Sequence, residues 1–242
     1  MPANRRFLLL QVRNAGDPMR EHEICCFAES LGCEADQLEA VDLITGDISD
    51  HHLHQCDVVL IGGAGDYSVA TGGPWLERAL DLMRRLCDQS KPTFASCWGF
   101  QALARALGGE VIHDLDRAEV GTFELTLTDA GRRDPVFGPL GARFDAQLGH
   151  EDRVVTLPAN AELLASSERT TNQAYRITGK PIYATQFHPE LTREHLVARL
   201  RRYPKYVETV ARMSFEELLD ATRETPETTT LMPRFLREVL GD

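Results

Sequence analysis

The chain has 242 residues, of which 43% are hydrophobic and 26% are charged, and its formal net charge is −11. These values are typical of a globular protein with a normal hydrophobic core, and the length suits one large domain or two small ones. The acidic balance argues against nucleic acid as a partner, because phosphate binding needs a basic surface.

The N-terminal apolar run is short. It covers only Phe7–Val12, which is too few residues for a signal-peptide core or a membrane span, so we expect no membrane partner and a buried first strand. The six cysteines form no CxxC pair and no disulfide-framework spacing. Reduced cysteines in a cytoplasmic protein are therefore expected.

The first half of the chain alternates strands with helices, which predicts a parallel sheet covered by helices on both faces. The expected strands are Phe7–Val12, Asp36–Asp42, Asp57–Ile61 and Pro92–Phe94, and the expected helices are Met19–Leu31, Pro74–Cys87 and Phe100–Leu107.

The second half is β-rich after residue 109, with no long helix until residue 192. Its expected strands are Glu110–His113, Gly121–Thr128, Arg143–Leu148, Val154–Leu157, Glu162–Ser166, Tyr175–Thr178 and Pro181–Gln186. The fold class that follows is α/β and flavodoxin-like, with a mostly parallel sheet and a β-rich second half.

The end of the chain returns to a helical pattern. The expected helices are Arg193–Arg201, Pro204–Arg212, Phe215–Thr222 and Pro233–Leu240, with a loop over Glu224–Thr230. We assign residues 1–200 to the α/β domain and residues 201–242 to a C-terminal helical extension packed on it. The extension fits simple packing, a lid over a site or a subunit contact.

A strand-to-helix elbow is predicted around Cys97. The strand that ends near Phe94 and the helix that begins near Phe100 leave Cys97 on the turn, between the small residues Ala95 and Gly99. A helix N-terminus favours the thiolate, which is the nucleophilic form of cysteine. Cysteines more often simply pack in a core, so the elbow alone does not decide between the two roles.

Two further strand ends carry suitable partners for a nucleophile. The run Gly62–Asp66 follows the third strand, where glycines permit close approach of the backbone to a ligand, although a plain turn also fits. His188 and Glu190 follow the last strand and could supply a base and its orienting carboxylate. Ligands bind at the carboxyl ends of strands in such sheets, so all three groups are expected at one edge.

Other histidines lack such support. His51, His52 and His54 show no metal-ligand spacing and are expected in an exposed loop, and no metal or cofactor is predicted. His113 and His195 have no evident companions in the sequence.

Taken together, these motifs resemble the class I, or triad-type, glutamine amidotransferases. The run Cys97–Gln101 is similar to the family's C-x-G-x-Q motif, and Gln186–Glu190 matches its Q-F-H-P-E motif. Gly62–Gly65 resembles the oxyanion loop, and His150–Pro158 resembles the segment H-x-D-x-V-x-x-L-P. The resemblance covers roughly residues 40 to 195.

The resemblance implies a mechanism and a set of residues. Cys97 would attack the side-chain amide of glutamine, His188 would pass the thiol proton to ammonia, Glu190 would orient His188, and water would hydrolyse the γ-glutamyl thioester. The resemblance further implies an oxyanion hole from Gly63 and Trp98, and substrate contacts from Gln101, Gly149, His150 and Glu151. Two positions differ from the usual family pattern, with Ala95 in place of glycine and Gly149 in place of serine.

Three functions stay open at this stage. The chain shows no S-G-G-x-D-S loop and no Walker A motif, so the ammonia acceptor would be a separate synthetase or acceptor subunit. A stand-alone hydrolase of γ-glutamyl amides or peptides is the first alternative, and a non-catalytic binding or regulatory module on the same fold is the second. A homo-oligomer is compatible with all three.

Overall fold

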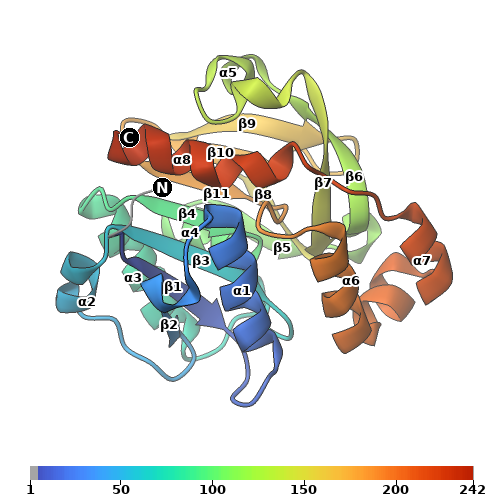
Figure 1. Ribbon diagram of the computed structural model, residues 1–242, viewed down its shortest axis with the longest axis horizontal. Helices are drawn as coiled ribbons and strands as arrows, with labels where there is room; N and C mark the ends of the chain where they lie inside the picture. The colour runs from blue at the N-terminus through green and yellow to red at the C-terminus, as the bar shows by residue number, and fades with distance from the viewer. Residues whose placement is uncertain (1–4, 242) are drawn as a thin grey trace.

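The computed structural model describes residues 5–241, and it has the expected α/β class, with two sheets (Figure 1). The strands are β1 (Phe7–Val12), β2 (Leu38–Asp42), β3 (Val58–Ala64), β4 (Thr93–Ser96), β5 (Glu110–His113), β6 (Glu119–Leu127), β7 (Arg143–His150), β8 (Asp152–Thr156), β9 (Ala161–Ser167), β10 (Ala174–Ile177) and β11 (Ile182–Thr185). Every strand predicted from the sequence is present.

The main sheet has nine strands in the order β2-β1-β3-β4-β11-β10-β9-β6-β7, and β5 pairs with β8 in a small second sheet. The pairs from β2 to β11 are parallel, and the pairs from β11 to β7 are antiparallel. The sheet is therefore mixed: the predicted α/β half forms its parallel part, and the predicted β-rich half extends it with antiparallel strands.

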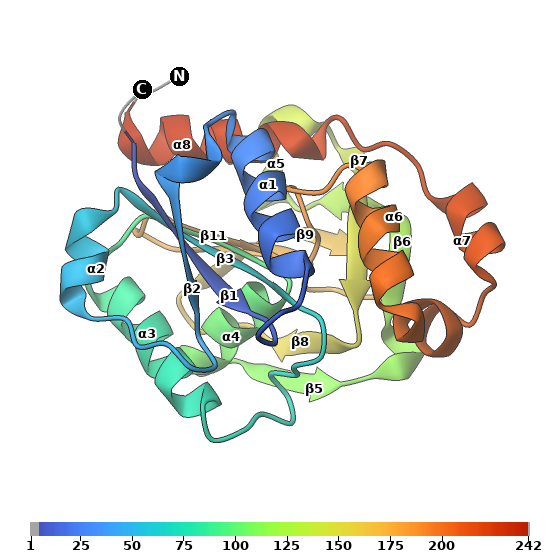
Figure 2. The same cartoon turned by 60° about the horizontal axis from the view of Figure 1, so that its bottom comes forward.

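The α-helices cover both faces of this sheet and one of its ends (Figure 2). They are α1 (Met19–Leu31), α2 (Asp50–Gln55), α3 (Leu76–Asp88), α4 (Trp98–Ala106), α5 (Asp129–Arg133), α6 (Arg193–Arg202), α7 (Phe215–Ala221) and α8 (Leu231–Leu240). A π-helical segment, η4 (Tyr206–Ala211), lies between α6 and α7.

Strand β1 explains why the core has two halves. Its side chains alternate across the sheet, so Leu8 and Leu10 join the core under α3 and α4, while Phe7 and Leu9 join the core under α1 and α8. A continuous apolar run is what a parallel strand needs when both of its faces are covered.

Two local predictions were wrong. His51, His52 and His54 lie on helix α2 and not in an exposed loop, because a capping box between Ser49 and His52 begins a helix there. The last helix, α8, begins at Leu231 and not at Pro233, since a proline in the first helical turn needs no backbone N–H bond.

The last helix is part of the core. Phe235 of α8 is fully buried, and its ring centroid lies 5.2 Å from that of Phe94 and 5.8 Å from that of Tyr183, both on central strands. Helix α8 lies beside α1 on the same face of the sheet (Figure 1). These contacts are what a packed extension requires, whereas the division of the chain at residue 200 stays a prediction. No helix within residues 5–241 has the length and apolar character needed to cross a bilayer.

The substitution Phe235→Ala should destabilise the whole domain, because it leaves a cavity between α8 and the central strands. We expect a loss of about 3–5 kcal/mol in the free energy of unfolding, measured by urea denaturation. The control Met213→Ala removes an exposed apolar side chain and should change this free energy by less than about 0.5 kcal/mol. Equal, small effects of both variants would show that α8 adds nothing to the stability of the core.

Candidate active site

The site lies where three adjacent parallel strands end. In the register of β3, β4 and β11, Ile61 pairs with Ala95, and Ala95 pairs with Ala184. Gly63 comes two residues after Ile61, and Cys97 comes two residues after Ala95. His188 comes four residues after Ala184. The structure therefore brings the three predicted strand-end groups to one edge of the sheet.

Cys97 sits on a strained elbow between β4 and α4. Its backbone has φ 52° and ψ −102°, a conformation that residues other than glycine rarely adopt. The Cys97 N–H donates to the Thr185 carbonyl at 2.8 Å, and the Cys97 carbonyl accepts from the Gln101 N–H at 3.2 Å. The turn is thus bonded to strand β11 on one side and to helix α4 on the other. The thiol lies 3.7 Å from the Gly149 carbonyl oxygen, at the N-terminal end of α4.

Gly63 lies against both Cys97 and His188. A Cβ atom at this position would be 2.9 Å from His188 Cε1 and 3.6 Å from Cys97 Cβ, so only glycine leaves room for the imidazole. Strand β3 is irregular here: Gly62 and Gly63 face the single residue Gln11 of β1. Such a bulge takes one residue out of the ladder of hydrogen bonds.

His188 and Glu190 form a buried, charge-assisted pair. Glu190 Oε1 lies 2.6 Å from His188 Nδ1, and both side chains are almost completely buried. Burial alone lowers the pKa of His188, but the charges of Glu190 and Cys97 outweigh it and raise the pKa to about 9. Burial alone raises the pKa of Glu190, but His188 and Arg199 outweigh it and lower the pKa.

A row of buried charges continues behind Glu190. Arg199 Nη1 lies 3.6 Å from Glu190 Oε1, and Arg199 Nη2 lies 3.7 Å from Glu23 Oε1. Glu23 in turn makes a 2.9 Å ion pair with Arg13 Nη2. The charges alternate in sign along this row, so each buried charge lies next to one of the opposite sign. This pairing offsets the free-energy cost of removing the charges from water.

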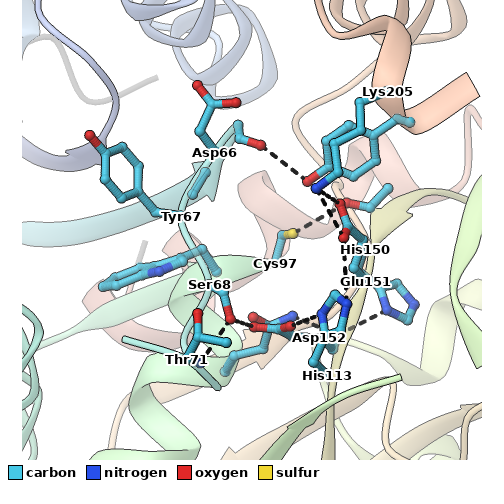
Figure 3. Close-up of a pocket in the computed structure, with 16 residues that line it drawn as sticks. Asp66, Tyr67, Ser68, Thr71, Cys97, His113, His150, Glu151, Asp152 and Lys205 are labelled. Atoms are coloured by element: carbon cyan, nitrogen blue, oxygen red, sulfur yellow. Dashed lines mark hydrogen bonds and ion pairs between the residues drawn. The ribbon is translucent and has the colours of Figure 1, made fainter. Parts of the chain in front are cut away.

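The pocket in front of Cys97 is lined by polar side chains (Figure 3). Asp152 accepts hydrogen bonds from the Ser68 hydroxyl at 2.6 Å and from the Ala70 N–H at 3.1 Å, and its Oδ1 lies 3.0 Å from His113 Nδ1. Asp152 therefore fastens the loop after β3 to the turn between β7 and β8. His113 has companions after all, because it also lies 3.9 Å from Glu151.

The four predicted substrate-contact residues all line this pocket. The Gln101 amide donates to the Asp152 carbonyl at 2.8 Å and to Gln186 Oε1 at 3.1 Å. The His150 ring is turned away from Cys97, since its nitrogens lie 3.0 Å from the Asp152 carbonyl and 3.0 Å from Glu119 Oε2. Both nitrogens of the His150 ring therefore have partners within the protein.

Several residues of the site region escaped the sequence analysis, and Arg199, Lys205 and Tyr206 are three of them. Arg199 could have been noticed, because it occupies the apolar face of α6 together with Leu196 and Leu200. Lys205 and Tyr206 line the pocket from the C-terminal extension, and no motif marked them. Among the described residues, no group of three or more His, Cys, Asp or Glu side chains could hold a metal ion.

Comparison with known proteins decides the family. The sequence pattern of the family "Glutamine amidotransferase class-I" matches residues 24–200. The chain belongs to the class I glutamine amidotransferases.

Curated relatives within this family include a subunit of the glutamine-hydrolyzing GMP synthase from Methanocaldococcus jannaschii, which is 33% identical over 51% of this chain and 63% of its own length. The corresponding protein from Sulfurisphaera tokodaii is 31% identical over 69% of this chain and 83% of its own length. The match thus spans slightly less than two thirds of the M. jannaschii relative.

Solved structures show the same class I amidotransferase fold. A glutamine amidotransferase from Thermotoga maritima superposes with a TM-score of 0.77 at 20% identity, covering 98% of this chain and 99% of that one. A glutamine amidotransferase from Methylobacillus flagellatus gives 0.73 at 18% identity, covering 98% and 94%.

The pKa of His188 provides a test of the pair. In Glu190→Gln, burial of His188 remains while its main opposite charge is lost, so we expect its pKa to fall from about 9 to about 6.5 or below. NMR titration of the imidazole nitrogens measures this. The control Glu29→Gln removes the carboxylate beside His195, 3.4 Å away, and should leave His188 unchanged. A His188 pKa of about 9 in Glu190→Gln would contradict the conclusion that Glu190 raises it.

The same shift makes stability depend on pH. Since the pKa of His188 in the folded state lies above its unfolded value of about 6.5, its contribution is fully present below pH 6.5. The contribution is lost as the pH rises through about 9. Urea denaturation at pH 6 and pH 9.5 should show a larger loss in the wild type than in Glu190→Gln, and an equal loss in both would be inconsistent with the pair.

The close approach of Gly63 to His188 predicts that Gly63→Ala displaces the imidazole. The added methyl group would lie 2.9 Å from His188 Cε1, and we expect a changed NMR signal and pKa for His188. In Gly149→Ala the methyl group meets no atom within 4 Å, so His188 should keep its pKa of about 9. Identical His188 titrations in Gly63→Ala and the wild type would refute the predicted contact.

Proposed function

We propose that Cys97, His188 and Glu190 act as a catalytic triad that releases ammonia from the side-chain amide of glutamine. The observation that carries the proposal is the placement of His188. It interacts with Glu190 at 2.6 Å on one side and with Cys97 on the other. A cysteine nucleophile needs such a base, and the base needs an orienting group.

In the first step, His188 accepts the thiol proton, and the Cys97 thiolate attacks the γ-carbonyl carbon of glutamine. The carbonyl π-electrons move to oxygen, which becomes a tetrahedral oxyanion. We propose that the N–H groups of Gly63 and Trp98 stabilise it. Two features support this assignment. The bulge at Gly63 interrupts the ladder of hydrogen bonds between β1 and β3, and Trp98, as the first residue of α4, has an N–H group with no acceptor inside the helix.

In the second step the tetrahedral intermediate collapses. The C–N bond breaks, and the imidazolium of His188 gives its proton to the departing nitrogen, so that ammonia leaves and a γ-glutamyl thioester with Cys97 remains. His188 then takes a proton from water, whose oxygen attacks the thioester carbon. The C–S bond breaks, His188 returns the proton to sulfur, and glutamate leaves.

We propose that the rest of the glutamine molecule lies over the turn between β7 and β8. Gln101 and the backbone of residues 149–152 border the pocket beside Cys97, and Glu151 adds a carboxylate. His150 acts through its backbone here, while its ring, bonded to Glu119, fixes the shape of the turn.

We further propose that the ammonia goes to a separate synthetase or acceptor subunit, in the cytoplasm. The names of the relatives support this proposal, since each is named as one subunit of a GMP synthase. The six unpaired cysteines agree with a reducing compartment. A stand-alone γ-glutamyl hydrolase is the second candidate, because the same steps cleave a γ-glutamyl peptide.

The decisive variant is Cys97→Ala. Ammonia release from L-glutamine should fall at least about a thousandfold, because no other group can form the thioester. The control Cys25→Ala replaces an exposed cysteine outside the pocket and should keep the wild-type rate. Retained activity in Cys97→Ala would remove the proposed mechanism.

A second substrate separates the two candidate functions in the same assay. Cys97-dependent cleavage of a γ-glutamyl dipeptide without ammonia release from glutamine would identify a γ-glutamyl hydrolase. Binding of glutamine without turnover of either substrate would favour the regulatory module. Ammonia release from glutamine supports the amidotransferase.

A further inference from the structure

The segment Tyr203–Tyr206 bridges the two walls of the pocket. It belongs to the C-terminal extension and lies outside residues 24–200, which the family pattern matches. One wall is the end of β3 with the loop that follows it, and the other is the turn between β7 and β8 (Figure 3). The segment contacts both, so the extension forms part of the pocket.

On the first wall, the contact is made at Gly65. A Cβ atom there would lie 2.5 Å from Tyr203 Cζ, so the absence of a side chain at Gly65 lets the tyrosine ring pack directly on the backbone. The Tyr206 hydroxyl donates to the Gly65 carbonyl at 3.4 Å. The Tyr203 hydroxyl accepts from Arg13 Nη1 at 2.9 Å and donates to Asp17, and these two hydrogen bonds fix the position of the ring.

On the second wall, the contact is the ion pair between Lys205 and Glu151. Lys205 Nζ lies 2.8 Å from Glu151 Oε1 and 3.1 Å from Oε2. The Glu151 side chain is only 12% exposed, whereas that of Lys205 is 61% exposed and can move toward a ligand. Lys205 is the single lysine or arginine among the described residues that line the pocket.

The other carboxylates of the pocket are already bonded. Asp152 holds Ser68, Ala70 and His113, and Asp66 accepts from the Asn14 amide at 3.0 Å. Lys205 and Glu151 are therefore the two oppositely charged side chains of the pocket that a zwitterionic ligand can contact at the same time. Free glutamine carries such a pair at its α-carbon, an ammonium and a carboxylate.

We propose that Lys205 is a specificity residue that binds the α-carboxylate of free glutamine, while Glu151 binds its α-ammonium. This inference rests on the proposed function. The ion pair opens to receive the zwitterion, and each charge exchanges one partner for another of the same sign. Glutamine residues within a peptide chain carry neither charge, so the pair excludes them.

The test compares L-glutamine with L-glutamine α-amide, which lacks the α-carboxylate. In Lys205→Met we expect KM for L-glutamine to rise roughly tenfold or more, because a charge-assisted contact is lost, with kcat changed less than about twofold. The KM for the α-amide should stay within about twofold. Lys205→Arg keeps the charge and should largely restore KM for L-glutamine. Lys180→Met, outside the pocket, is the control.

Two results would overturn the inference while leaving the proposed function intact. One is an unchanged KM for L-glutamine in Lys205→Met. The other is an equal rise for both substrates, which would mean that Lys205 only supports the shape of the pocket.

Binding measurements keep the inference separate from turnover. Calorimetry in the Cys97→Ala background gives the Kd of each compound with and without Lys205→Met. A roughly tenfold weaker binding of L-glutamine alone supports the role of Lys205 even if the wild type shows no turnover, which would overturn the triad proposal only. An unchanged Kd overturns the role of Lys205. No binding of either compound overturns both proposals.

Discussion

The in-register pairing of β3, β4 and β11 is the constraint on which the site depends. Because these parallel strands end together, the groups that follow Ile61, Ala95 and Ala184 meet at one edge of the sheet. A slip of one residue in any of the three would turn every following side chain to the opposite face. The two hydrophobic cores, one on each face, fix this register, so the geometry around Cys97 follows from the packing of the whole domain.

The second requirement of the site is electrostatic. A buried imidazolium at His188 is stable only beside negative charge, and Glu190 supplies it at 2.6 Å. Glu190 then needs its own counter-charge, and the row continues through Arg199 to Glu23 and Arg13. The helices α1 and α6, which carry Glu23 and Arg199, are thereby held to the edge of the sheet that carries Cys97 by charge as well as by apolar contact.

The sequence predicted the strands well because their signals are local. Continuous apolar runs, glycines after strands and the motifs around Cys97 and His188 each depend on neighbouring residues. The mixed character of the sheet and the place of Lys205 depend on contacts between distant residues, which periodicity does not reveal. His113 illustrates the point, since its partners Glu151 and Asp152 come from another strand and its turn.

The contact between Tyr203 and Arg13 joins residues 190 positions apart in the chain, and that between Tyr206 and Gly65 joins residues 141 apart. The pocket is therefore built from early, middle and late parts of the polypeptide, and β4 gains its second neighbour only when β11 has been made. During synthesis at about 5–20 residues per second, Cys97 leaves the ribosome roughly 5–20 s before Tyr206. A newly made chain thus carries its thiol for seconds before the pocket around it can form.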